Sequence, residues 1–247
     1  MNGRIELVEG NRGSGKTEFL TELGYFHMRA GGYWFPNIEV NVEAIRLRME
    51  EEGYIFEPSR LIPLPANCDN WHTKIARGTP NNLVMITIDE AQFKYDAFEG
   101  KVAKDDRGIF ALARKLDILL IFATQRASKL SKVLRDDFDF MWKCKNLKQW
   151  KILGIFPFPF NIRFRIGSHM INGVPEVVTR YPVFGRQWVW KLYNSDALLG
   201  DMAQRLGGLQ ILEAKELTRI KTKTEPIDWA PTLAALCASL SIFLLAR

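Results

Sequence analysis

The sequence predicts an α/β fold with a mainly parallel sheet, on three observations. A glycine-rich loop joins a short apolar strand at 5–8 to a segment with helical spacing at 18–26. Two further apolar runs, 83–88 and 118–123, are continuous, as in strands that are buried on both faces of a parallel sheet. The segment 109–115 between them has the pattern of a crossover helix, which parallel neighbours require. We therefore expect ligand-binding loops at the carboxyl ends of these strands.

The composition is that of an ordinary globular protein. Of 247 residues, 47% are hydrophobic and 25% are charged, which excludes a disordered, collagenous or coiled-coil chain. The length suits one large domain or two small ones. Three scattered cysteines without C-x-x-C spacing exclude a disulfide framework and a zinc finger. Three isolated histidines argue against a metal enzyme built on histidine.

The glycine-rich loop has the pattern G-x-x-x-x-G-K-T in a strand-loop-helix context. Its backbone N–H groups and the start of the next helix favour a bound phosphate. Lys16 is expected to reach the β- and γ-phosphates, and the Thr17 hydroxyl to ligate Mg²⁺. ATP and Mg²⁺ are therefore the predicted cofactors. The predicted nucleotide-binding residues are Gly10, Asn11, Arg12, Gly13, Ser14, Gly15, Lys16 and Thr17.

Polar residues follow the two apolar runs at the edge of the sheet where the loop lies. Asp89 and Glu90 end the first run. We expect Asp89 to hold Mg²⁺ and Glu90 to polarise the attacking water for hydrolysis of the γ-phosphate. The second run leads into Thr124-Gln125-Arg126, and Gln125 is the candidate sensor of the nucleotide state. The sequence thus predicts a P-loop NTPase fold.

A basic, aromatic segment follows the predicted core. Residues 141–190 hold eight Lys and Arg residues against one acid, Glu176. Alternation in several short runs predicts strands; the runs are 140–142, 150–153, 162–166 and 187–192. Pro157 and Pro159 mark a loop or an edge. The segment is interpreted either as a groove for single-stranded DNA or as a solvated or lipid-facing surface.

The final residues form a candidate membrane span. Residues 231–246 contain no charge, and their apolar positions run all round a helix. The alternative is an amphipathic or buried terminal helix. Basic residues just before the span place the large domain in the cytoplasm by the positive-inside rule, and the first residues lack a signal peptide. The expected organisation is an ATPase core at 1–140, a basic β-rich extension of the same domain at 141–225 and a transmembrane segment at 229–247.

Several stretches resemble one family. Residues 119–126, L-L-I-F-A-T-Q-R, together with the loop and Asp89-Glu90, resemble the FtsK/HerA class of DNA-pumping ATPases. Within that class the sequence is more similar to the zonula occludens toxin-like family, the assembly ATPases of filamentous phage. Further stretches that resemble this family are 32–38, 117–146, and 181–184 with 191–195.

The resemblance implies a membrane-anchored phage ATPase that uses ATP hydrolysis to move phage DNA during virion assembly and extrusion. It implies phage DNA, the host inner membrane, other phage assembly proteins and a homo-oligomeric ring as partners. Family members continue beyond the membrane into a periplasmic domain, whereas this chain ends at Arg247. One alternative is therefore a genome-packaging ATPase of a membrane-containing phage, and another is a slow nucleotide-dependent assembly scaffold.

Ring ATPases complete each catalytic site with an arginine from the neighbouring subunit. The candidates here are Arg114, Arg126 and Arg135. Arg114 ranks first because its predicted helix separates the strand that ends in Asp89 from the strand that precedes Gln125.

Overall fold

The computed structural model describes most of the chain up to residue 194. The described residues are 3–65, 68, 71–74, 78–79, 83–98, 102, 104–146, 151–152, 156–157, 163–171, 173–183 and 187–194. The chain divides into two compact units, Met1–Met202 and Ala203–Arg247. The candidate span at 229–247 lies outside the described residues. Within the described part, no helix has the length and apolar character needed to cross a membrane.

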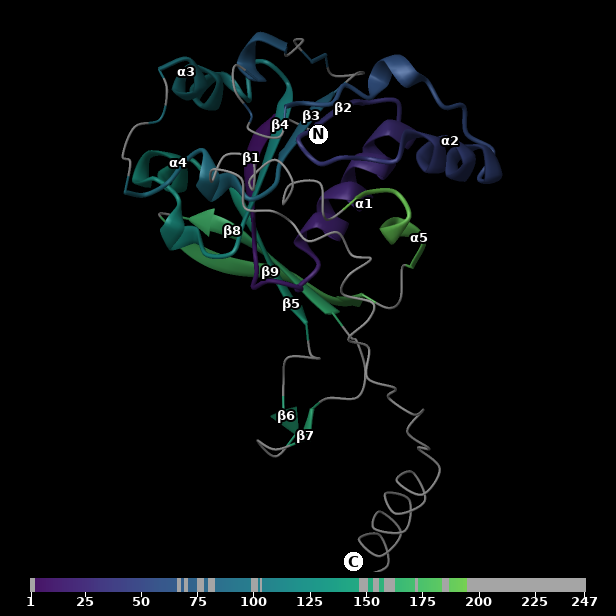
Figure 1. Ribbon diagram of the computed structural model, residues 1–247. Helices are drawn as coiled ribbons and strands as arrows, with labels where there is room; N and C mark the ends of the chain where they lie inside the picture. The colour runs from purple at the N-terminus through teal and green to yellow at the C-terminus, as the bar shows by residue number, and fades with distance from the viewer. Residues whose placement is uncertain are drawn as a thin grey trace, which may run out of the picture. The chain divides into compact units, whose positions relative to one another are not determined.

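A seven-stranded sheet forms the centre of the first unit (Figure 1). Its strands, in spatial order, are β2 (Tyr33–Pro36), β3 (Val84–Ile88), β4 (Ile118–Thr124), β1 (Arg4–Glu9), β5 (Phe140–Asn146), β8 (Arg163–Ile171) and β9 (Val174–Val183). The first five strands are parallel, whereas β8 and β9 are antiparallel to their neighbours. The predicted strands at 5–8, 83–88 and 118–123 are confirmed as β1, β3 and β4.

Helices cover both faces of this sheet (Figure 1). The α-helices are α1 (Lys16–Arg29), α2 (Val42–Glu51), α3 (Lys104–Leu112), α4 (Lys132–Asp136) and α5 (Gln187–Trp190). Short 3-10 turns are η1 (Pro58–Arg60), η2 (Trp71–Lys74), η3 (Ala91–Phe93) and η4 (Ala127–Lys129), and β6 (Lys151–Ile152) pairs with β7 (Phe156–Pro157) in a separate two-stranded sheet. Asn41 caps α2 by accepting a hydrogen bond from the Ala44 N–H at 3.0 Å.

Two hydrophobic cores follow from the burial of β4, the central strand of the five parallel ones, on both faces. All seven residues of β4 are buried. Leu120 and Phe122 belong to the core that contains Phe110 of α3, whereas Ile121 packs in the core that contains Phe19 of α1. Side chains alternate between the two faces of a strand, so a continuous apolar run supplies both cores. The sequence pattern at 118–123 therefore reflects a strand in the interior of the sheet.

Two predicted elements differ from the structure. The alternation at 187–192 predicts a strand, but the run begins with helix α5. Val189 and Leu192 are both buried, and a spacing of three residues places them on one helical face. The crossover helix expected at 109–115 spans Lys104–Leu112 instead, and the chain then turns through Asp117, whose φ is 53°. The prediction of a crossover is correct, but its bounds are wrong.

Two arginines attach β8 to α1. The Arg165 guanidinium lies 2.7 Å from the Glu22 carboxylate, and each side chain is only 5% exposed. Arg163 forms an ion pair with Glu18, one turn nearer the start of the helix. Arg165 also lies 4.1 Å from the centre of the Phe19 ring. The interpretation of the basic segment as a surface groove is therefore wrong for these two arginines, because both pair with α1, Arg165 being buried and Arg163 half-buried.

The buried pair gives a stability prediction. Glu22→Ala leaves the Arg165 charge buried without its carboxylate, which is expected to lower the free energy of unfolding by about 3 to 5 kcal/mol. Glu50→Ala removes an exposed partner of Arg46 on α2. It is expected to lower the free energy of unfolding by less than about 1 kcal/mol. Urea unfolding of both variants checks this difference. Equal losses would contradict a structural role for the Glu22 pair.

Candidate active site

The glycine-rich loop lies at the carboxyl end of β1 and leads directly into α1. Gly13 and Gly15 have φ values of 74° and 88°, in the left-handed region that strongly favours glycine. Gly15 is the N-cap of α1 and supplies no side-chain cap, so the first N–H groups of the helix need another acceptor. The loop therefore has the backbone conformation of an anion site at the start of a fourteen-residue helix.

Two side chains of this loop fit a phosphate ligand. The Ser14 hydroxyl is buried and has no hydrogen-bond partner among the described residues. Lys16 is only 6% exposed, and a buried ammonium group favours nearby anions. A bound phosphate would satisfy the hydroxyl and neutralise the ammonium. This match between two polar groups and one anion supports a nucleotide site.

Asp89 faces the loop from the end of β3. The Thr17 hydroxyl donates a hydrogen bond to the Asp89 carboxylate at 2.5 Å. The Asn37 side chain holds the Asp89 backbone through both of its polar groups, because it accepts from the Asp89 N–H at 2.7 Å and donates to the Asp89 carbonyl at 3.2 Å. Burial raises the pKa of the Asp89 carboxyl above its ordinary value. A nearby cation would therefore stabilise its charged form.

The oxygen atoms of Thr17 and Asp89 fit Mg²⁺, which prefers hard oxygen ligands and completes its shell with phosphate oxygens and water. Among the residues that the structure describes, no three His, Cys, Asp or Glu side chains gather to hold a metal ion.

Glu90 lies beside Asp89 in an uncommon backbone conformation. Its φ is 49° and its ψ is 44°, in the left-handed region, and its N–H donates to the Asp89 carboxylate at 2.9 Å. The Gln92 side-chain amide donates to the Glu90 carboxylate. The Gln92 carbonyl in turn accepts a hydrogen bond from the Thr124 hydroxyl at 2.8 Å. A continuous polar network thus joins the ends of β3 and β4.

The other predicted site residues fall into two places. Asn11 and Arg12 are exposed in the loop. Gln125 directly follows Thr124, the last residue of β4, whose carbonyl accepts a hydrogen bond from the Gly10 N–H at 3.2 Å. Arg114 lies in the turn after α3 and pairs with Asp139, whose carboxylate also accepts from the N–H of Ile5 near the start of β1. Arg114 therefore lies near the amino end of β1, whereas the loop lies at its carboxyl end. Its action on a neighbouring subunit stays a prediction.

Three residues that contact the site, Asn37, Gln92 and Thr124, are not among the predicted site residues, although Asn37 and Thr124 lie within the stretches 32–38 and 119–126. Asn37 and Thr124 stand at the carboxyl ends of β2 and β4, and this position could have indicated them. Gln92 lies in the short turn η3, where no local pattern marks it. Its contacts depend on β3 and β4 being neighbours in the sheet, which the local sequence does not show.

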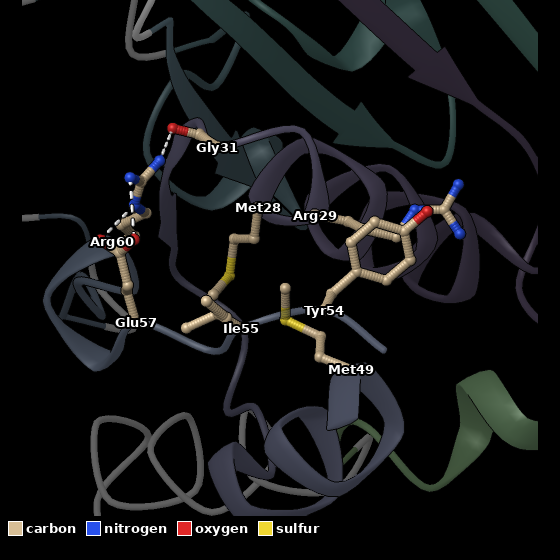
Figure 2. Close-up of a pocket in the computed structure, with 8 residues that line it drawn as sticks. All are labelled: Met28, Arg29, Gly31, Met49, Tyr54, Ile55, Glu57 and Arg60. Atoms are coloured by element: carbon tan, nitrogen blue, oxygen red, sulfur yellow. Dashed lines mark hydrogen bonds and ion pairs between the residues drawn. The ribbon is translucent and has the colours of Figure 1, made fainter. Parts of the chain in front are cut away.

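A separate cavity of about 150 Å³ lies at the other end of α1 (Figure 2). Figure 2 shows Met28, Met49 and Ile55 around it, with Arg60 hydrogen bonded to Gly31 at its rim. α1 separates this cavity from the phosphate loop by the length of a fourteen-residue helix, about 20 Å. The cavity is therefore distinct from the candidate active site.

No protein-family model and no curated protein matches the chain. Its structure is similar to the N-terminal domain of zonular occludens toxin from Neisseria meningitidis, with a TM-score of 0.50 and 15% identity over 78% of this chain and 100% of that one. The chain has the fold of a P-loop ATPase. The expected α/β class with a mainly parallel P-loop sheet is thus confirmed.

Two further solved structures are similar to this P-loop ATPase fold. The genome packaging NTPase B204 from Sulfolobus turreted icosahedral virus 2, in complex with ATP-gammaS, gives a TM-score of 0.46 at 15% identity, over 72% of this chain and 98% of that one. The DNA-packaging ATPase B204 from Sulfolobus turreted icosahedral virus gives a TM-score of 0.47 at 13% identity, over 72% and 98% of the two chains.

The phosphate loop gives a binding prediction. Lys16→Ala is expected to raise the Kd for ATP at least about tenfold, because it removes a charged hydrogen bond to phosphate. Lys115→Ala removes an equal charge from an exposed position in the turn after α3 and is expected to leave the Kd within about twofold. Titration calorimetry with ATP checks both values. An unchanged Kd for Lys16→Ala would overturn the loop assignment.

Proposed function

We propose that this chain is a membrane-anchored phage ATPase that hydrolyses ATP to move phage DNA during virion assembly and extrusion. The observation that carries the ATPase part is the 2.5 Å hydrogen bond between Thr17 and Asp89, which joins the phosphate loop to a buried carboxylate. The fold shared with the zonular occludens toxin domain and the resemblance of residues 119–126 to DNA-pumping ATPases support the motor part.

The site residues have separate roles in this proposal. Lys16 binds the β- and γ-phosphates, while Thr17 and Asp89 hold Mg²⁺, which when bound neutralises charge on the phosphate oxygens. Glu90 accepts a proton from the attacking water. The water oxygen forms a bond to the γ-phosphorus, the bond from that phosphorus to the β-phosphate oxygen breaks, and ADP and phosphate leave. Gln125 reports which nucleotide is bound.

The antiparallel strands are connected to the catalytic helix, which supports coupling of hydrolysis to movement. Arg163 of β8 pairs with Glu18, two residues after Lys16. The Trp190 indole N–H of α5 donates to the same carboxylate at 2.5 Å. A change in the position of the first turn of α1 on nucleotide binding would therefore move contacts to β8 and α5.

The basic residues of the extension divide between the two faces of the sheet. Register pairs Cys144 with the buried Arg165 on the face that packs against α1. Lys143 and Lys145 lie on the other face, and Arg180 is on that face too, because Ile166 pairs with both Lys143 and Arg180. Lys145 and Arg180 are exposed and Lys143 is half-buried. We assign this outer face to DNA, since its charges are accessible to phosphates.

The remaining parts of the proposal rest on the sequence. The segment 229–247 is assigned as the single span in the host inner membrane, with the ATPase unit on the cytoplasmic side. Ring assembly and contacts with other phage assembly proteins follow from the family resemblance. Packaging of DNA into a capsid and slow hydrolysis by an assembly scaffold are the alternatives. Turnover stimulated by single-stranded DNA supports extrusion, turnover stimulated only by duplex DNA supports packaging, and turnover indifferent to DNA supports the scaffold.

Replacement of the proposed base separates hydrolysis from binding. Glu90→Gln is expected to bind Mg-ATP with an unchanged Kd and to lower kcat by about 100-fold or more, because the carboxylate that accepts the proton is lost. Glu176→Gln, at an exposed position in β9, serves as the control for the same chemical change. Phosphate release and ATP titration measure the two effects. Loss of binding in Glu90→Gln would mean that the role is misassigned.

The outer basic face predicts a salt-dependent DNA contact. Replacing Lys143, Lys145 and Arg180 by Gln is expected to flatten the log-log salt dependence of single-stranded DNA binding by about 2, at about 0.7 for each lost phosphate contact. A control that replaces the exposed Arg107, Lys115 and Lys132 by Gln has the same net charge. Fluorescence anisotropy at several salt concentrations compares them. Equal slopes in the two triple variants would mean that this face is solvated and does not contact DNA.

The proposed anchor predicts membrane release. Deleting residues 231–247 is expected to move the protein from the membrane pellet to the supernatant while the Kd for ATP stays unchanged, because the predicted site residues all precede the deleted segment. Carbonate extraction of membranes checks the distribution. A deletion variant that stays in the pellet would place membrane attachment elsewhere in the chain.

A further inference from the structure

We propose that Gln92 is a positioning residue that holds the Glu90 carboxylate for activation of the attacking water. The inference rests on the proposed function, because it gives Glu90 a task that requires a defined orientation. Gln92 does not touch the nucleotide in this proposal and acts only through Glu90.

The Gln92 side chain is fixed at both ends of its amide. It is 6% exposed, its NH₂ group donates to the Glu90 carboxylate, and its carbonyl accepts from the Thr124 hydroxyl at 2.8 Å. A carboxylate only accepts hydrogen bonds and a carbonyl cannot donate, so the NH₂ end of the amide faces Glu90 and the carbonyl end faces the Thr124 hydroxyl. Thr124 itself is fully buried in the central strand. A buried residue of the sheet therefore holds the carbonyl end of the amide.

The Thr124 hydroxyl has a second nearby acceptor, the Arg126 carbonyl at 3.2 Å. One hydroxyl carries one proton, and the shorter contact to Gln92 is the stronger of the two. The Thr124 carbonyl also accepts from the Gly10 N–H, so the same residue contacts the phosphate loop. The network thus extends from the loop through Thr124 and Gln92 to Glu90.

Glu90 needs such support because of where it lies. It is half-buried in the turn after β3, and its left-handed backbone directs the side chain away from a regular strand path. Its carboxylate has two oxygens, and the Gln92 amide occupies Oε2. The second oxygen stays able to accept a proton from water. A hydrogen bond to one oxygen therefore orients the Glu90 carboxylate and leaves its other oxygen available to accept the proton.

A purely structural role of the network makes a different prediction. If Gln92 and Thr124 only connected β3 to β4, their loss would lower stability and affect nucleotide binding and turnover together. A positioning role instead lowers kcat at nearly unchanged KM for ATP. The two roles also differ in additivity, because residues that act in series show little further loss when both are removed.

The test uses steady-state ATP hydrolysis by the full chain in Gln92→Met and Thr124→Val, with Thr124→Ser as the rescue and Thr87→Val as the matched control. Gln92→Met keeps the volume and removes the amide, and Thr124→Val keeps the shape and removes the hydroxyl. Thr87 is a fully buried threonine of β3 whose hydroxyl accepts from the Trp34 indole N–H at 2.9 Å, outside the network that ends at Glu90.

We expect kcat to fall about 10- to 100-fold in Gln92→Met, the range of one hydrogen bond to a charged group, with KM for ATP within about twofold. Thr124→Val lowers kcat in the same direction, Thr124→Ser recovers most of that loss, and Thr87→Val keeps kcat within about twofold. The double variant Gln92→Met with Thr124→Val is no slower than Gln92→Met. If Gln92→Met does not fold, the comparison of the two Thr124 variants with Thr87→Val decides the question.

Three results would overturn the inference: an unchanged kcat in Gln92→Met, a raised kcat, which would mean that Gln92 restrains the base, or additive losses in the double variant. Glu90→Gln is measured alongside. If Glu90→Gln still hydrolyses ATP, the proposed role of Glu90 fails. If Glu90→Gln is inactive and Gln92→Met is fully active, only the positioning role fails.

Discussion

The Thr17 hydroxyl and the buried Asp89 carboxylate form the contact on which the rest of the site depends. It joins the first turn of α1 to the end of β3, and the two residues lie 72 positions apart in the sequence. A carboxylate with a raised pKa is costly to keep charged inside a protein. Asn37 holds its backbone in place while Lys16, in the adjacent loop, favours its charge. The site is thus organised for a cation and a phosphate before either binds.

The order of the strands determines which polar groups surround this contact. β4 lies between β1 and β3, so the end of the central strand touches the phosphate loop on one side and the turn after β3 on the other. Thr124 uses its carbonyl for Gly10 and its hydroxyl for Gln92. In a sheet with β1 directly beside β3, neither link could form in this way. The position of one strand therefore connects the loop to the candidate base.

The antiparallel extension has two chemically different faces. Its inner face carries Arg163 and Arg165, which are paired with α1 and contribute to the fold. Its outer face carries Lys143, Lys145 and Arg180, of which Lys145 and Arg180 are exposed and Lys143 is half-buried. Of the eight basic residues at 141–190, two therefore belong to the inner set and three to the outer one. The inner set also links the extension to the helix that follows the phosphate loop.

The phosphate loop, the Asp89-Glu90 pair and the parallel strands could all be predicted from the amino-acid sequence, because they depend on the order of neighbouring residues and on burial of a continuous run. The helix at 187–190, the inward arginines and the contacts that Gln92 makes could not be predicted from it. They are visible only in the folded chain. A contact between distant residues depends on which strands are neighbours and on which face of the sheet each side chain lies, and the local sequence pattern specifies neither.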